Sequence, residues 1–283
     1  MKLSEINIRD PYILTYQGKY YLYGTRAAST WGEMNGFDCY VGDSLEEWEG
    51  PIEIFKKPDG FWANQNYWAP ECYYYDNNFY LITTLGADNR KKGVHVLKAD
   101  NPLGPFEYQR QLTLKNQECI DGTIYEENSK KYLVYSRTFQ DSAFGDMYAL
   151  EISMDFKKIK ENPFRLFSAN EASWANPIPF AKSEFGLDGD FYFTDGPCLI
   201  RKENELLMLW SSWASKGYSV GIAKSTSKKI KGPWTQVKQP IIEDGGHGMI
   251  FRDLDGEYFY TYHYPNESEQ ERPKLVLLNN LIK

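Results

Sequence analysis

The chain has 283 residues, of which 42% are hydrophobic and 25% charged, a balance that is typical of globular proteins and excludes a disordered chain. Its 32 basic and 39 acidic side chains leave a formal net charge of −7, and no basic stripe is interleaved with aromatic residues, so we expect no nucleic-acid and no membrane partner. No apolar run is long enough for a signal-peptide core or a membrane span. We therefore expect a cytoplasmic protein if Met1 is the native start, and a secreted or periplasmic one if a signal peptide was removed.

A pattern of two short strands joined by a turn recurs five times along the chain. Each copy opens with a polar residue, continues as an apolar strand, turns at Gly, Asn or charged residues, and ends in an aromatic and β-branched strand. In chain order the copies cover residues 10–25, 71–84, 121–136, 195–212 and 247–262. The leading residues are 50 to 74 positions apart, and one four-stranded propeller blade usually takes roughly 40–50 residues.

Further strands follow the paired ones. Third apolar strands are predicted at residues 37–41, 93–97, 147–152, 218–223 and 274–278. Gly-Pro pairs, which end one strand before the next begins, precede candidate fourth strands at residues 50–51, 104–105 and 232–233. Residues 44–48 could form one helical turn at most, and residues 156–193 are interpreted as the main insertion, shaping one pocket wall.

This repetition predicts an all-β protein, a five-bladed β-propeller that forms a single catalytic domain over residues 1–283. A two-sheet sandwich is the alternative, but it gives no reason for five equivalent polar positions. The four cysteines form no CxxC pair, so they indicate buried free thiols and not a zinc site.

The first strand of each propeller blade lines the central channel, so the five leading residues are expected to meet there. They are Asp10, Glu71, Asp121, Asp195 and His247. Bringing four carboxylates together is costly through desolvation and mutual repulsion, and a fold would tolerate this mainly for function.

Glycoside hydrolysis fits such a set. It needs a carboxylic acid that protonates the leaving oxygen and a carboxylate that activates water or acts as nucleophile. A third carboxylate nearby can keep the acid protonated through like-charge repulsion. The sequence has no GxSxG, HExxH, P-loop or GxGxxG motif, so the corresponding chemistries are not indicated.

Four segments open successive repeats in a specific order: Arg9-Asp10-Pro11-Tyr12-Ile13, Trp68-Ala69-Pro70-Glu71, Ile120-Asp121-Gly122-Thr123 and Asp195-Gly196-Pro197. From about residue 8 to residue 273 the chain resembles glycoside hydrolase family 43. The resemblance implies a five-bladed propeller and an inverting mechanism on arabinose- or xylose-containing glycans of the plant cell-wall type. It implies Asp10 as general base and Asp121 as the residue that orients the acid and tunes its pKa.

The general acid is the point where the chain departs from that family, which usually has Glu-Gly-Pro where this sequence has Asp195-Gly196-Pro197. Aspartate is one methylene shorter. Glu171, on the preceding loop, is an equal candidate for the acid, and Glu71 is the third.

The resemblance also implies ligand contacts. His247, between two glycines, would help to hold a calcium ion and its waters, although calcium prefers oxygen ligands and a histidine hydrogen-bonded across the channel is an equal alternative. Arg272 could bind a sugar hydroxyl. Trp31, Trp68 and Trp174 could stack on a sugar ring, whereas Trp210 and Trp213 are expected to pack between blades.

Three functions follow from these features. The first is an inverting α-L-arabinofuranosidase. The second is a β-xylosidase or an endo-arabinanase on the same scaffold, because loop shape decides between a pocket and a groove. The third is a propeller that binds carbohydrate without cleaving it.

Overall fold

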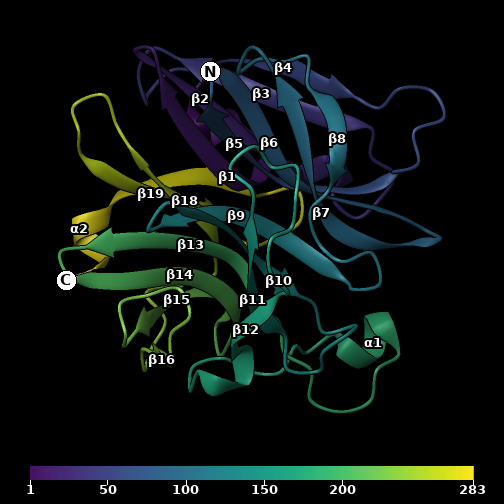
Figure 1. Ribbon diagram of the computed structural model, residues 1–283, viewed down its shortest axis with the longest axis vertical. Coiled ribbons are helices and arrows are strands. Elements are labelled where there is room, and N and C mark those ends of the chain that lie inside the picture. Colours follow the sequence, from purple (N-terminus) through teal and green to yellow (C-terminus); the bar gives the residue numbers. More distant parts are fainter. Residues whose placement is uncertain (283) are drawn as a thin grey trace. The chain divides into compact units, whose positions relative to one another are not determined.

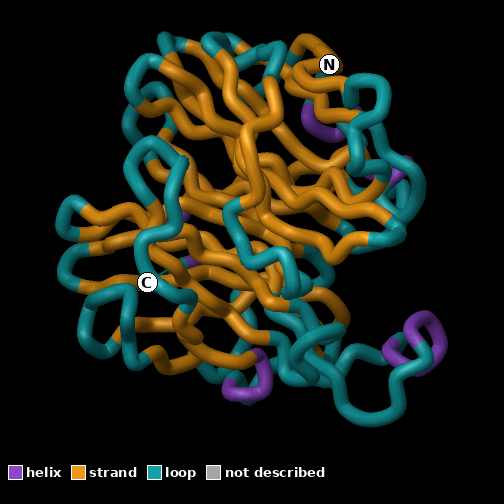
Figure 2. The backbone as a smooth tube through the Cα atoms, turned by 45° about the vertical axis from the view of Figure 1, so that its right-hand side comes forward, coloured by secondary structure: helices purple, strands orange, loops and turns teal. Residues whose placement is uncertain are grey.

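Strands carry most of the regular structure, and the helices are short (Figure 2). The computed structural model describes residues 1–282. These residues form five sheets, and the fold class is the predicted five-bladed β-propeller. They divide into two units, residues 1–116 with the C-terminal stretch from His247, and residues 117–246, and each unit is presented by itself. The single domain over residues 1–283 stays a prediction.

The first unit contains three sheets, with strand orders β1-β2-β3-β4, β5-β6-β7-β8 and β18-β19-β20 (Figure 1). Its strands are β1 (Ile8–Tyr16), β2 (Lys19–Arg26), β3 (Gly36–Gly42), β4 (Glu49–Lys56), β5 (Gln65–Tyr75), β6 (Asn78–Ala87), β7 (Arg90–Ala99), β8 (Glu107–Gln111), β18 (Gly246–Arg252), β19 (Tyr258–Tyr264) and β20 (Arg272–Leu277). Its helices are η1 (Leu3–Glu5), η2 (Ala27–Ser29) and α2 (Leu278–Leu281).

The second unit contains two sheets, β12-β11-β10-β9 and β13-β14-β15-β16, with β17 paired to β15. Its strands are β9 (Cys119–Glu127), β10 (Lys130–Arg137), β11 (Asp146–Ile152), β12 (Phe164–Ser168), β13 (Asp195–Lys202), β14 (Glu205–Ala214), β15 (Gly217–Ser225), β16 (Trp234–Gln236) and β17 (Ile242–Glu243). Its helices are η3 (Ala169–Glu171) and α1 (Ala181–Phe185).

The predicted first, second and third strands of every repeat are confirmed, and the sandwich is not. Strands β8 and β16 follow their Gly-Pro pairs, whereas Gly50 and Pro51 lie inside β4. The stretch 156–193 is not only an insertion, because it contains β12, the fourth strand of its sheet. Residues 44–48 form no helix.

Tight hairpins set the register of the first two strands. Gln17 and Gly18 have φ values of 48° and 76°, and Tyr16 pairs with Lys19 across them. Two positive φ values at the centre of a two-residue loop match the right-handed twist of the strands that it joins. Asp76 and Asn77 repeat this conformation between β5 and β6, one residue before Asn77 and Asn78, where the sequence predicts the turn.

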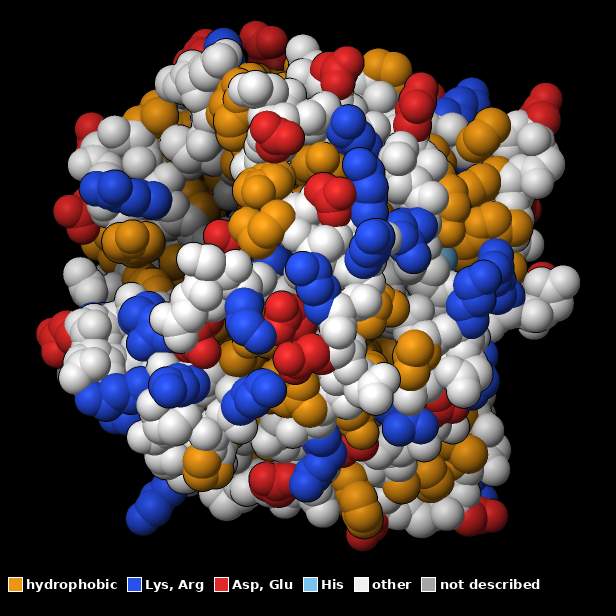
Figure 3. Space-filling view, in the orientation of Figure 1, with side chains coloured by type: hydrophobic (Ala, Val, Ile, Leu, Met, Phe, Trp, Pro, Cys, Tyr) orange, Lys and Arg blue, Asp and Glu red, His pale blue; other side chains and the backbone are white. Residues whose placement is uncertain are grey.

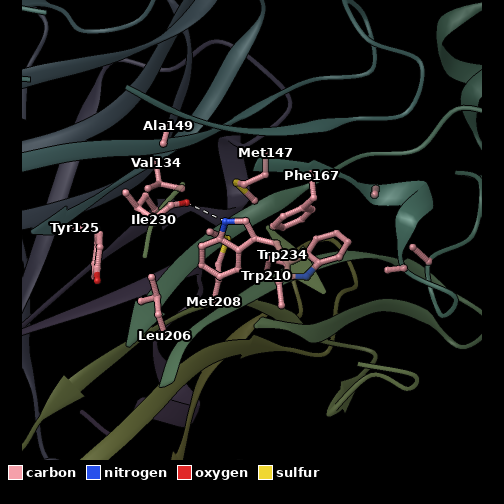
Figure 4. Packing of buried hydrophobic residues seen from close by; sticks show 14 of the residues in the cluster. Tyr125, Val134, Met147, Ala149, Phe167, Leu206, Met208, Trp210, Ile230 and Trp234 are labelled. Carbon is pink, nitrogen blue, oxygen red and sulfur yellow. Dashed lines mark hydrogen bonds between the residues drawn. The ribbon is translucent and has the colours of Figure 1, made fainter. Parts of the chain in front are cut away.

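Aromatic side chains fill the core of the second unit. Trp210 and Trp234 pack around Phe167 and Met208, and the Trp234 Nε1–H donates to the carbonyl oxygen of Ile230 at 2.9 Å (Figure 4). Burying such rings removes large apolar areas from water. In the first unit the corresponding core gathers aromatic residues of β2, β3, β5 and β6.

Gly221 leaves the space that Trp174 fills. A Cβ at residue 221 would lie 2.2 Å from Cζ2 of that ring. We expect Gly221→Ala to destabilise the protein by about 1–3 kcal/mol, because overpacking forces the ring or the backbone to move. Urea unfolding checks this result. Gly32→Ala, whose nearest atom would be 4.0 Å away, is the control, and equal stability of both variants would contradict the prediction.

The charged surface and the cysteines are as the amino-acid composition led us to expect. On the face in Figure 3, acidic and basic side chains are interspersed. Among the described residues, no helix is both long and apolar enough to cross a membrane. All four cysteines are buried thiols that form no disulfide, as predicted.

A β-bulge interrupts the first strand of four sheets. At each bulge two residues face one on the neighbouring strand, and the first of the two has a positive φ. These residues are Asp10 (51°), Ala69 (47°), Asp121 (56°) and Gly196 (47°), and His247 in β18 has a φ of 40°. Residues other than glycine rarely adopt this backbone conformation, which costs them roughly 1–2 kcal/mol each.

The bulges correct the predicted alignment of the leading residues. Asp10, Asp121 and His247 share the positive-φ position, but Glu71 lies two residues after it and Asp195 one residue before it. The sequence comparison matched polar residues, whereas the backbone repeats through the bulge.

Candidate active site

In the first unit the carboxylate of Asp10 is buried and held by a threonine of β2. Thr25 Oγ1 donates to Asp10 Oδ2 at 2.6 Å and accepts the backbone N–H of Ala69 at 2.8 Å. One hydroxyl thus joins the bulges of β1 and β5. The opposite oxygen, Asp10 Oδ1, faces two imidazoles.

These imidazoles belong to His247 and His263, whose Nδ1 atoms lie 3.4 and 3.5 Å from Asp10 Oδ1. The backbone N–H of Asp10 also donates to His263 Nδ1 at 3.3 Å. Complete burial, and then the charge of Arg9, lowers the pKa of His263 to about 3. His263 is therefore neutral at pH 7.

A buried ion pair lies beside this group. Arg9 Nη1 donates to Glu271 Oε1 at 2.7 Å, and only 1% of the Glu271 side chain is exposed. Arg9 Nη2 donates to Asn266 Oδ1 at 3.1 Å, and His263 Nε2 lies 3.1 Å from the same oxygen. Sequence reasoning missed His263, Asn266 and Glu271, because none of them opens a repeat.

In the second unit Asp121 and Asp195 come together from β9 and β13. One carboxylate oxygen of each lies within 4.8 Å of one of the other. The backbone N–H of Gly196 donates to Asp121 Oδ2 at 3.3 Å, and the Tyr218 hydroxyl donates to Asp195 Oδ2 at 2.6 Å.

Glu171 has a different environment. It lies in η3, where its Oε1 accepts the backbone N–H of Ser168 in a capping box and pairs with Arg165 Nη1 at 2.8 Å. Its side chain is 43% exposed. The capping bond and the ion pair engage this carboxylate within its own segment.

Glu71 is also engaged locally. Its carboxylate is buried and accepts a hydrogen bond from the Tyr73 hydroxyl. It lies two residues beyond the bulge of β5, whereas Asp10 and Asp121 are themselves the positive-φ residues of their bulges.

The predicted aromatic contacts divide into two groups. Trp31 is 71% exposed, and its ring meets that of Trp68 edge to face, with centroids 5.5 Å apart. The Arg9 guanidinium lies 5.6 Å from the centre of the Trp31 ring. Trp174 is 5% exposed and packs on Trp210 in the core, so its predicted role in sugar stacking is corrected to one in core packing.

The Arg272 guanidinium is bonded to the backbone. It donates to the carbonyl oxygens of Ser4, Glu269 and Glu271, at 3.1, 3.3 and 2.8 Å. The bond to Ser4 fastens the start of β20 to the N-terminal turn. The expected contact of Arg272 with a sugar hydroxyl stays a prediction.

Within the first unit the Asp10 carboxylate lies beside His247, with Oδ1 3.4 Å from Nδ1. Calcium takes six to eight oxygen ligands, so an ion held here would keep water in part of its shell. A water-mediated calcium site at His247 stays a prediction, and no reaction step is assigned to it.

Known proteins resemble this chain both in sequence and in structure. Residues 3–277 match the family model described as glycosyl hydrolases family 43. The crystal structure of an endo-arabinase from Bacteroides thetaiotaomicron VPI-5482 has a TM-score of 0.88 and 31% identity, covering 98% of this chain and 96% of that one. An α-L-arabinofuranosidase from Lactobacillus brevis has a TM-score of 0.73 at 18% identity, covering 98% and 94%, and this likeness shows the fold alone.

A curated relative is the extracellular endo-α-(1→5)-L-arabinanase 2 of Bacillus subtilis (strain 168). It is 22% identical over 280 residues, which are 88% of this chain and 54% of the relative. The chain thus spans about half the length of this curated relative.

Proposed function

The chain belongs to the glycosyl hydrolases of family 43, enzymes that hydrolyse O-glycosyl bonds, and on this premise we propose that it is an inverting endo-arabinanase acting on α-1,5-linked arabinan. One observation carries the choice of substrate: the Bacteroides thetaiotaomicron endo-arabinase is similar at 31% identity over nearly the full length of both chains. This observation ranks the endo-arabinanase alternative above the α-L-arabinofuranosidase expected first, because the arabinofuranosidase neighbour is only 18% identical.

In the proposed mechanism Asp10 is the general base. Thr25 holds one of its oxygens, and the other, which faces His247 and His263, would accept a proton from the attacking water. Asp195 is the general acid and Asp121 orients it, in keeping with the bond from Gly196 to Asp121. An inverting pair stands roughly 6.5–9.5 Å apart, and this separation of Asp10 from Asp195 stays a prediction.

The exposed Trp31, with the half-buried Trp68 beside it, is proposed to stack on arabinose units of the substrate. The Bacillus subtilis relative is described as extracellular, and this supports a proposal that the present chain is also secreted.

Product analysis tests the proposed function. Linear arabinan, nitrophenyl arabinofuranoside, nitrophenyl xyloside and xylan are incubated with the full chain, and viscosity and released oligosaccharides are followed. An endo-arabinanase lowers the viscosity of arabinan early and releases arabino-oligosaccharides. Release of arabinose alone would favour the arabinofuranosidase, release of xylose the xylosidase, and binding to arabinan without turnover the carbohydrate-binding propeller. Each of these three outcomes would overturn the proposal.

The acid is identified by a pair of variants. We expect Asp195→Asn to lower kcat on arabinan about 100-fold, because an amide cannot give a proton to the leaving oxygen. Glu171→Gln is the matched control and should stay within about threefold of the parent, since its contacts are local. Initial rates on arabinan measure both, and the reverse ranking would assign the acid to Glu171.

A further inference from the structure

The backbone of Asp10 is bonded to a histidine of another sheet. Asp10 lies in the bulge of β1, where its N–H falls outside the paired register with β2. That N–H donates to Nδ1 of His263, which is on β19 and fully buried. We propose that His263 is a positioning residue that holds Asp10 in its left-handed conformation and thereby aims the carboxylate. The inference rests on the proposed role of Asp10 as base.

The same device recurs at two other bulges. The N–H of Ala69 donates to Thr25 Oγ1. The N–H of Gly196 is shared between Asp195 Oδ1 of its own strand, at 3.1 Å, and Asp121 Oδ2, at 3.3 Å. In each case a side chain of a neighbouring sheet in the same unit accepts from the N–H of the positive-φ residue. A buried N–H that lacks a partner costs about 1–3 kcal/mol, so each bulge needs such an acceptor. For Asp10 the acceptor is His263.

Only one tautomer of His263 can serve. A backbone N–H always donates, so Nδ1 must carry a lone pair. The proton of the neutral ring is then on Nε2, which points at Asn266 Oδ1, an atom that only accepts, at 3.1 Å. These two hydrogen bonds require the same proton position, and Asp10 Oδ1, 3.5 Å from Nδ1, lies farther from this nitrogen than the backbone N of Asp10 does.

A charge fixes the orientation of the Asn266 amide. Arg9 Nη2 donates to the same Oδ1, so the amide cannot turn its NH₂ group toward His263 without facing the cation. Arg9 is in turn held by the buried carboxylate of Glu271. A chain of contacts thus leads from Glu271 through Arg9, Asn266 and His263 to the backbone of Asp10. Each side chain in it limits the orientation of the next one.

Two substitutions at residue 263 distinguish the loss of the hydrogen-bond acceptor from the loss of side-chain volume. Asparagine places an amide oxygen near the position of Nδ1, whereas leucine fills the space and accepts nothing. We expect His263→Leu to lower kcat on arabinan at least about 50-fold with KM within about twofold, and His263→Asn to stay within about fivefold of the parent. Equal kcat values for the two variants would overturn the proposal. Asp59→Asn, at an exposed carboxylate of the same unit, is the control.

Asn266→Leu provides a second route if His263→Leu does not fold. It removes the acceptor of Nε2 and leaves the ring in place, and we expect kcat to fall about tenfold with KM unchanged. An unchanged kcat would overturn the proposal.

A measurement without substrate keeps this proposal distinct from the proposed function. In ¹⁵N NMR of the wild-type chain, His263 should show an unprotonated Nδ1 and a protonated Nε2. The opposite tautomer would overturn the proposal even if the chain cleaves arabinan. The expected tautomer in a chain that leaves arabinan intact would uphold the backbone contact and reject the proposed function alone.

Discussion

Replacing Asp10 with asparagine is expected to lower kcat on arabinan about 10³- to 10⁴-fold, with KM within about threefold. The amide is the size of the carboxylate and can still accept the bond from Thr25, but it cannot take a proton from water. Asparagine tolerates a positive φ at least as well as aspartate, so the bulge at φ 51° should persist. The loss should therefore be one of chemistry and not of folding.

Initial rates on arabinan over a range of concentrations measure kcat and KM separately, and the thermal midpoint reports folding. Asp59→Asn removes an exposed carboxylate from the same unit and should leave kcat unchanged. If Asp10→Asn keeps more than about a tenth of the parent kcat, Asp10 is not the base.

The sequence was sufficient for the fold because the repeat is carried by strands and turns. Alternation of aromatic and β-branched residues predicts each strand, and pairs such as Gln17 and Gly18 predict the hairpins. The bulges were harder to see, since one extra residue leaves the polar pattern intact. The signal was present: Asp10, Ala69 and Gly196 each precede a proline, and Asp121 and His247 each precede a glycine.

The candidate site was predictable only where a residue opens a strand. Asp10 and Asp121 were found in this way, and the structure gives both a positive φ. Trp174 was misassigned because its loop position hides the space that Gly221 leaves for its ring. His263 follows no periodic rule, since its role depends on β19 meeting β1 across more than 250 residues of chain.

The stability of the first unit is expected to depend on pH through two buried histidines. Burial, and then the charge of Arg90, lowers the pKa of His95 to about 3, and burial together with Arg9 does the same for His263. An unfolded histidine titrates near 6.5. Between these pH values the unfolded chain binds protons that the folded chain does not bind. The free energy of unfolding therefore keeps its full value above about pH 6.5 and decreases as the pH falls toward 3.

The surroundings of His95 explain why its imidazole stays unprotonated in the folded chain. Its Nδ1 lies 3.2 Å from the Tyr108 hydroxyl, and its Nε2 has no partner among the described residues. The ring packs on Trp62, over which the Arg90 guanidinium lies 4.2 Å from the ring centre. A second positive charge here would be buried, unpaired and beside a cation.

At pH 5 each histidine is expected to cost about 2 kcal/mol of unfolding free energy relative to pH 7.5, or on the order of 4 kcal/mol together. Urea unfolding at the two pH values measures this difference. His95→Gln and His263→Asn should each remove about half of it, because neither amide titrates in this range, whereas Asp59→Asn should leave it intact. If the parent and the three variants all lose the same free energy of unfolding between pH 7.5 and pH 5, then carboxylates and not these histidines cause the loss of stability at acid pH.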